Sequence, residues 1–165
     1  MPTHAASHDD REQPDPAELG PAAELSSREY EQLANFRHTL RQLVRQTELE
    51  AHKVGLTPQH YHLLLAIKGF PGREWANIGE LAERLQIRHN AVIGLVNRAE
   101  ARGLVARRQD EQRADRRTVR VTLTPEGERV LGGLVAALRE ERLRVQAAAQ
   151  ALIDHEEGEL HGSHA

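Results

Sequence analysis

Hydrophobic residues recur every three or four positions through most of the chain, the spacing at which side chains share one face of a helix. The pattern predicts helices over about 27–52, 58–68, 78–85, 89–102 and 125–153. Typical helix starts support these boundaries, because Asn77 precedes one run and Thr-Pro pairs at 57–58 and 124–125 precede two others. In the second helix we expect Tyr61, Leu64, Leu65 and Ala66 to be buried.

Residues 118–123 instead alternate between polar and apolar side chains, which is typical of a half-buried strand. The apolar run 104–106 can pair with it as a hairpin, and Trp75-Ala76 predicts a minimal third strand. A basic hairpin that directly follows a helix indicates a winged helix-turn-helix. The predicted fold class is therefore mainly α with a small β wing, flanked by N- and C-terminal dimerisation helices.

The helix over 89–102 has two different faces. Val92, Leu95, Val96 and Ala99 fall on one side, which we expect to be buried. The opposite side carries Asn90, Gly94 and Asn97. Glycine inside a helix costs roughly 0.5–1 kcal/mol relative to alanine. Gly94 therefore indicates close approach, either to a DNA groove or to a neighbouring helix.

Charge is distributed unevenly, although the 165 residues sum to only −3. Residues 84–120 hold ten arginines against four carboxylates. A charge run alone is more often a solvated face, but this one coincides with the helix and hairpin and indicates a phosphate-binding surface. Residues 1–25 and 154–165 are acidic and predict a disordered tail and a flexible tail, which leaves one domain over 26–153. Within it, 56–123 forms the DNA-binding lobe, and 27–52 and 125–153 form dimerisation helices.

Other functions find little support in the composition. The chain has no cysteine and no glycine-rich phosphate loop, so we expect neither an enzyme nor a cofactor. His60 and His62 point to different faces of a helix, and His38 and His52 are too far apart, so no metal site is predicted. No apolar run is long enough to span a membrane and no secretory signal is present, so we expect a cytoplasmic protein.

Several of these segments together resemble the MarR family of transcriptional regulators. The resemblance covers about 28–153 and rests on Leu56-Thr57-Pro58, on the first helix of the helix-turn-helix at 78–85, and on the segment 92–105. The most specific part is Asp115-Arg116-Arg117, followed by a strand that ends in Leu-Thr-Pro-Glu-Gly at 123–127. The resemblance implies a homodimer on pseudo-palindromic DNA, usually a repressor released by a small ligand. It also implies that Arg117 enters the minor groove and that Asp115 orients it.

The chain departs from the family pattern at the recognition helix. The position before this helix is usually Ser or Thr but here reads Arg88-His89-Asn90, and Gly94 stands where a larger polar residue is common. The expected DNA-binding residues are Arg88, His89, Asn90, Ile93, Gly94, Asn97, Arg98, Arg113, Asp115, Arg116 and Arg117. Of these, Arg98, Arg113 and Arg116 are expected to hold phosphates. Two alternatives remain: Asn90 caps the helix, or Asp115 and Arg117 only stiffen the wing.

Two further sites are expected in the helices outside the lobe. Dimer contacts are predicted at Leu33, Leu138, Leu143, Val145, Leu152 and Ile153. A small effector, with an aromatic carboxylate as one candidate, is predicted where the dimerisation helices meet the lobe, against Phe36, His38, Leu40, Arg41, Tyr61, His62, Leu65 and Leu134. The same residues could simply fill the core. Alternatives to a ligand-responsive repressor are an architectural or activating DNA-binding protein without an effector, and a metal-responsive repressor.

Overall fold

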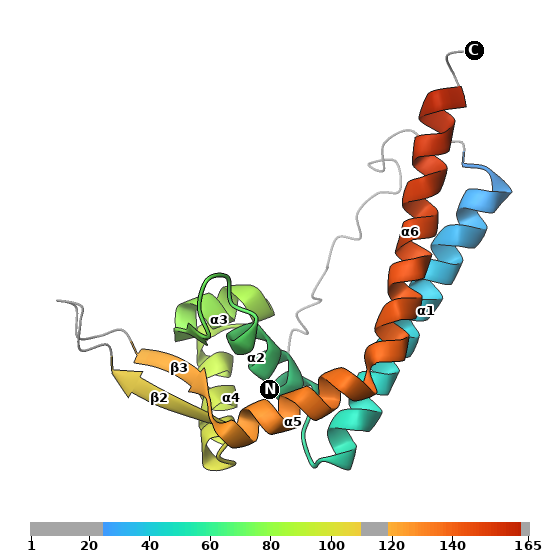
Figure 1. The fold of residues 1–165 in the computed structure, drawn as a ribbon. Helices are drawn as coiled ribbons and strands as arrows, with labels where there is room; N and C mark the ends of the chain where they lie inside the picture. Colours follow the sequence, from blue (N-terminus) through green and yellow to red (C-terminus); the bar gives the residue numbers. More distant parts are fainter. Residues whose placement is uncertain (1–24, 110–118, 163–165) are drawn as a thin grey trace, which may run out of the picture.

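The computed structural model describes residues 25–109 and 119–162, with side chains through residue 154. Its elements follow one another in the order α1 (Ser27–Lys53), α2 (Pro58–Lys68), β1 (Trp75–Ala76), α3 (Ile78–Leu85), α4 (His89–Ala101), β2 (Val105–Gln109), β3 (Val119–Leu123), α5 (Pro125–Ala137) and α6 (Arg139–Gly162). The expected fold class, a mainly helical protein with a small β wing, is confirmed (Figure 1). Within the described part of the chain, no helix is long and apolar enough to cross a membrane.

The molecule divides into a lobe and an arm. The lobe gathers α2, α3, α4 and the sheet, whereas α1 and α6 lie side by side and extend away from it (Figure 1). One long-range hydrogen bond ties the two arm helices together, since Gln32 Nε2 donates to the carbonyl of Ala151 at 3.1 Å. Helix α5 crosses beneath the lobe and connects it to the arm.

Local capping explains where the helices begin. Asn77 accepts from the backbone N–H of Glu80 at 2.9 Å, and the Glu80 carboxylate accepts from the N–H of Asn77 at 2.9 Å, a reciprocal capping box. Thr124 Oγ1 accepts from the N–H of Gly127 at 3.0 Å, with Pro125 in the first turn. These are the starts that the sequence predicts.

The sheet has the order β1-β3-β2, and both pairings are antiparallel. Val105 lies opposite Leu123, and Gln109 lies opposite Val119 at the far end. Strands β2 and β3 therefore project together from the lobe (Figure 1). The segment that connects them, residues 110–118, lies outside the described residues.

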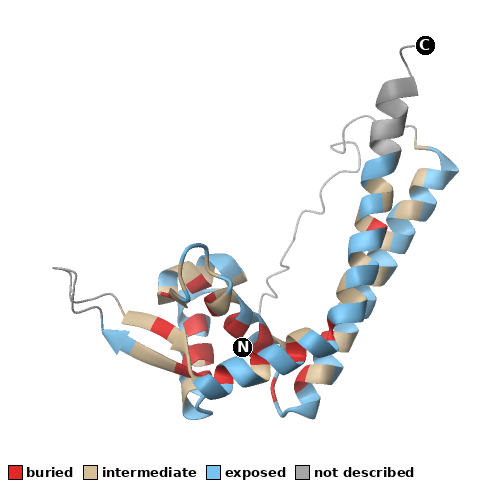
Figure 2. Ribbon diagram, viewed as in Figure 1, coloured by how far each residue is buried: buried red, intermediate tan, exposed pale blue. Residues whose placement is uncertain are grey.

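The hydrophobic core lies almost entirely in the lobe, where buried segments concentrate (Figure 2). The predicted buried face of α4 is confirmed, because Val92, Leu95, Val96 and Ala99 are at most 2% exposed. In α2 the prediction was partly wrong. Tyr61 and Leu64 are buried, but Leu65 is 42% exposed and Leu63 is fully buried in its place. Helix α2 is contacted by elements on several sides, so its buried side chains do not form a single stripe, and the prediction also missed the fully buried Ile67.

The helix predicted over 125–153 is two helices. Helix α5 ends at Ala137. Its C-cap Leu138 is 1% exposed and belongs to the lobe core, and α6 then turns to follow α1. Neither proline nor glycine marks this break, which is why the periodicity did not indicate it. Helix α6 continues to Gly162, through most of the segment expected as a flexible tail. The N-terminal tail, apart from Leu25, lies outside the described residues.

Candidate nucleic-acid interface and effector pocket

Helix α4 carries the candidate base-reading surface. Arg88, His89, Asn90, Asn97 and Arg98 are all exposed, opposite the buried face of the helix. Ile93 is 37% exposed, so an apolar contact to a thymine methyl group is sterically available. The helix therefore combines an anchored apolar face with an accessible polar one.

The start of α4 is open. Arg88 is the N-cap residue, and its side chain makes no capping hydrogen bond. Asn90 lies within the first turn, so the alternative that Asn90 caps this helix is wrong. The first N–H groups of a helix lack intrahelical partners and carry partial positive charge. This end of α4 is suited to approaching a DNA phosphate.

Gly94 lies on the open face and not in a helix–helix contact. A methyl group at this position would meet only the Arg98 guanidinium, at 3.2 Å, which is the mobile end of a side chain on the same helix. The alternative that Gly94 permits tight packing against another helix therefore finds no partner in the described chain. The absence of a side chain instead leaves the middle of the exposed face flat.

Arg107 on β2 connects the wing to α4, and the sequence interpretation overlooked it. Its guanidinium pairs with the Glu100 carboxylate and also donates to Asn97 Oδ1 at 2.7 Å. Glu100 further accepts from the backbone N–H of Arg107 at 3.3 Å. Because an asparagine pairs bidentately with adenine through both amide atoms, Asn97 cannot offer its oxygen freely while this contact holds. The spacing of Glu100 and Arg107 gave no local signal for the pair.

The wing itself is described only along its strands. Arg108 and Gln109 are exposed where β2 leaves the lobe. Arg113, Asp115, Arg116 and Arg117, which sequence analysis assigned to the tip, lie outside the described residues. Their predicted contacts to phosphates and to the minor groove remain predictions.

A pocket lies where the arm meets the lobe. It has a volume of about 290 Å³ and is lined by Leu43, Val44, Thr47, Pro58, Tyr61, His62, Leu65 and Arg142. Three predicted residues, Tyr61, His62 and Leu65, are among them. The expected cation Arg41 is not, and Arg142 of α6 takes that place, with its Nη1 donating to the carbonyl of Val135 at 2.6 Å.

The other residues predicted for this pocket lie elsewhere. Leu134 is 3% exposed within the lobe core. The rest occupy α1 outside the pocket: Phe36 and Leu40 are half-buried, and His38 and Arg41 are exposed. Partial desolvation of its ring lowers the pKa of His62. The pocket is thus mainly apolar, with Arg142 as its permanent cation.

The arm keeps apolar side chains at its surface. Of the predicted dimer residues, Leu33, Leu143 and Ile153 are 42–49% exposed, and Val145 and Leu152 are half-buried. Leu138 was wrongly included, because it is buried in the core of its own chain. Among the residues that the structure covers, no group of three or more histidines and carboxylates gathers as a metal site.

A helix-turn-helix with an open recognition helix and an attached hairpin defines a winged-helix DNA-binding protein. The family model described as MarR family matches residues 54–117, which span α2 through the hairpin loop. A sequence comparison with curated proteins gives no significant match.

Solved structures share the whole fold. A MarR family protein from Bacillus stearothermophilus is 21% identical, with 84% of this chain and 97% of that chain covered and a TM-score of 0.61. A mutant of E. coli MarR in complex with operator DNA is 17% identical, with 78% and 90% covered and a TM-score of 0.56. BpsR of Bordetella bronchiseptica, whose DNA binding is regulated by 6-hydroxynicotinic acid, is 23% identical, with 74% and 92% covered and a TM-score of 0.56. The chain therefore shares the fold of MarR family structures, and its residues 54–117 match the MarR family model.

Proposed function

We propose that the protein is a homodimeric, ligand-responsive repressor that binds a pseudo-palindromic operator. The observation that carries DNA recognition is the exposed N-terminal half of α4, held by a fully buried opposite face. A related MarR structure contains operator DNA, which supports the same role for this surface.

Within this proposal the residues of the interface have different tasks. Arg88, His89, Asn90 and Ile93 read base edges in the major groove, where an arginine or asparagine pair discriminates by about 1–3 kcal/mol. Arg98 and the wing residues Arg113 and Arg116 hold phosphates, which positions the protein without reading sequence. By resemblance to the family, Arg117 enters the minor groove and Asp115 orients it.

Dimerisation is supported by the surface of the arm. Leu33, Leu143 and Ile153 leave more than two fifths of their side chains exposed on two paired helices, as do Tyr30, Val44 and Leu49. Large apolar side chains gathered on one element mark an interaction surface. A second copy of the arm would cover them and would set two α4 helices at a fixed separation, which a two-fold operator requires.

Release by an effector is supported by the pocket between α1, α2 and α6. A ligand there contacts the arm and the lobe together, and so can favour one separation of the two lobes over another. It changes DNA affinity only as far as it binds the two arrangements unequally. Arg142 beside an apolar wall suits an aromatic carboxylate. BpsR, which responds to 6-hydroxynicotinic acid, supports a ligand of this class.

Operator selection from a random DNA library, followed by fluorescence anisotropy, tests the DNA-binding part of the proposal. We expect an inverted repeat with half-sites about one helical turn, about 10 base pairs, apart, bound by two protomers. A single asymmetric DNA site bound by one protomer would contradict the proposed binding as a homodimer.

A benzoate titration of the protein–operator complex tests the effector. We expect release from the wild-type complex and weaker release with Arg142→Gln. Arg41→Gln is the matched control, because it removes an arginine of the arm that lies outside the pocket. Equal effects of the two substitutions would place the benzoate elsewhere.

A further inference from the structure

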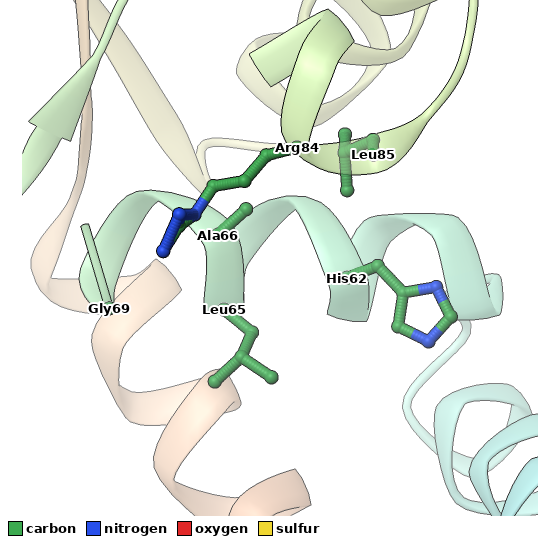
Figure 3. Close-up of a pocket in the computed structure, with 6 residues that line it drawn as sticks. All are labelled: His62, Leu65, Ala66, Gly69, Arg84 and Leu85. Atoms are coloured by element: carbon green, nitrogen blue, oxygen red, sulfur yellow. The ribbon is translucent and has the colours of Figure 1, made fainter. Parts of the chain in front are cut away.

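A second groove lies between α2 and α3, on the lobe itself. Its volume is about 530 Å³, and its lining residues are His62, Leu65, Ala66, Gly69, Arg84 and Leu85 (Figure 3). It shares His62 and Leu65 with the arm–lobe pocket, but Arg142 takes no part in it. The groove therefore adjoins the arm–lobe pocket but has a cation of its own, Arg84.

The lining favours one kind of ligand. Leu65, Ala66 and Leu85 offer apolar surface, and Leu65 is 42% exposed there. Arg84 extends from α3 across α2 toward Gly69 (Figure 3). Among the described residues no carboxylate pairs with Arg84, whereas Arg73 and Arg107 each have a glutamate partner. A single unneutralised guanidinium beside apolar surface complements an anion that carries an apolar body.

Arg84 is also one end of a stack of alternating arginine and aromatic side chains. Its guanidinium lies 5.0 Å from the centre of the Phe70 ring, and the Arg73 guanidinium lies 4.3 Å from the centre of the same ring. Arg73 in turn lies 3.7 Å from the Trp75 ring, and Arg120 lies 4.2 Å from it. All four distances are within the roughly 6 Å over which a cation is attracted to an aromatic ring.

This stack joins elements that are distant in sequence. It begins on α3 with Arg84, passes through the segment between α2 and β1, and ends with Arg120 on β3. Strand β3 is one arm of the hairpin that forms the wing. A ligand that binds Arg84 and moves it away from Phe70 therefore disturbs one end of the stack. The other end of the stack, Arg120, lies on strand β3 of the wing.

We propose that the α2–α3 groove binds an organic monocarboxylate with an apolar body through Arg84, and that the arginine–aromatic stack conveys its binding to strand β3. The binding step does not depend on the proposed effector pocket. Its consequence for DNA rests on the proposed function, since the ligand alters DNA affinity only if it favours one position of the wing.

Isothermal titration calorimetry of the free protein with octanoate tests the site. We expect octanoate to bind and the neutral octanamide to bind at least about tenfold more weakly, since a hydrogen bond to a charged group is stronger than a neutral one. Arg84→Gln should weaken octanoate binding by about tenfold or more, and Arg84→Lys should retain part of it. Arg41→Gln is the matched control, because Arg41 lines neither pocket, and it should leave the affinity unchanged. If only Arg142→Gln weakened binding, octanoate would lie in the arm–lobe pocket and the proposal would be overturned.

Trp75 provides an internal reporter for the stack, because it is the single tryptophan of the chain. We expect octanoate to shift the tryptophan emission of the wild type. In Phe70→Leu, which removes the ring between Arg84 and Arg73, octanoate should still bind but the shift should be lost. An unchanged emission on binding to wild type, or a full shift in Phe70→Leu, would refute the role of the stack. Both measurements are made without DNA. They therefore test the groove and the stack even if the protein does not bind the proposed operator.

Discussion

Arg107 Nη2 on strand β2 donates to Asn97 Oδ1 on helix α4 across 2.7 Å. Together with the ion pair between Arg107 and Glu100, this bond fixes the recognition helix against the first strand of the wing. The two parts of the protein that are expected to touch DNA are thereby held in one geometry. We therefore propose that Asn97 acts through Arg107 and that the start of α4 reads the bases.

Asn97→Ala and Arg107→Ala are therefore expected to weaken binding to all DNA sequences alike. For Asn97→Ala the loss should be about 2- to 12-fold, since one hydrogen bond contributes about 0.5–1.5 kcal/mol. The double variant should be no weaker than Arg107→Ala, because both changes remove the same contact. Anisotropy against a panel of single-base operator variants measures this.

Asn90→Ala is the control for that experiment. Asn90 is exposed in the first turn of α4 and has no hydrogen bond to the described strands of the wing, so its loss should relax the preference at particular base pairs. If Asn97→Ala also relaxed the preference at one base pair only, Asn97 would be a base reader after all.

Gly127 and Gly133 on α5 should respond oppositely to alanine. A Cβ at Gly127 would lie 2.0 Å from the carbonyl oxygen of Leu104, whereas a Cβ at Gly133 would meet nothing within 4 Å. Gly127→Ala should therefore lower the free energy of unfolding by about 1–3 kcal/mol or more. Gly133→Ala should raise it by about 0.5–1 kcal/mol, because alanine favours the helix. Urea denaturation followed by circular dichroism compares the two, and equal changes would contradict the close approach at Gly127.

Stability is expected to fall in mild acid because of His60. This residue is 5% exposed, and its Nδ1 accepts from the backbone N–H of Thr57 at 3.3 Å. Burial, followed by the nearby charges of Arg102 and Arg98, lowers the pKa of His60. The unfolded chain then takes up a proton below about pH 6.5 that the folded chain does not. The free energy of unfolding therefore decreases as pH falls from about 6.5 toward the lowered pKa.

His60→Gln is the informative variant for this prediction. Glutamine can replace histidine in the capping box with Thr57 but does not titrate. Urea denaturation at pH 7.5 and pH 5 should show a smaller loss of stability in the variant. A residual loss is expected from His62, whose pKa burial also lowers. An identical loss in both proteins would show that His60 is not responsible.

Leu143→Glu should split the proposed dimer without unfolding the protomer. Leu143 is 49% exposed in the single chain, so a glutamate there remains solvated until a second arm covers it. Covering it would bury an unpaired charge, which is strongly unfavourable. Light scattering should report a monomer with unchanged circular dichroism. Gln146→Glu, at an exposed polar position of the same helix, is the control and should stay dimeric.

Local sequence signals determined the helices of the lobe and the buried face of α4. Capping side chains act within three residues, and apolar stripes extend over a few turns. The cap at Asn77 and the buried face from Val92 to Ala99 could therefore be predicted from the local sequence. The same reasoning found the hairpin, because the alternation along 119–123 predicts a half-buried strand, and Val121 is buried at its centre. The resemblance to the MarR family added the wing pattern, which periodicity does not contain.

Contacts between distant segments were decided only by the tertiary structure. The pairing of Arg107 with Asn97 depends on how β2 leaves the lobe, and Arg142 rather than Arg41 reaches the pocket because α6 turns after Leu138. Leu65 belongs to a stripe of α2 but lies on its open side, since the neighbours of α2 cover the other sides. Spacing along a chain reports which side chains share a face, but it does not report which element will cover that face. The linings of the arm–lobe pocket and of the α2–α3 groove depend on which element covers which face, so only the tertiary structure defines them.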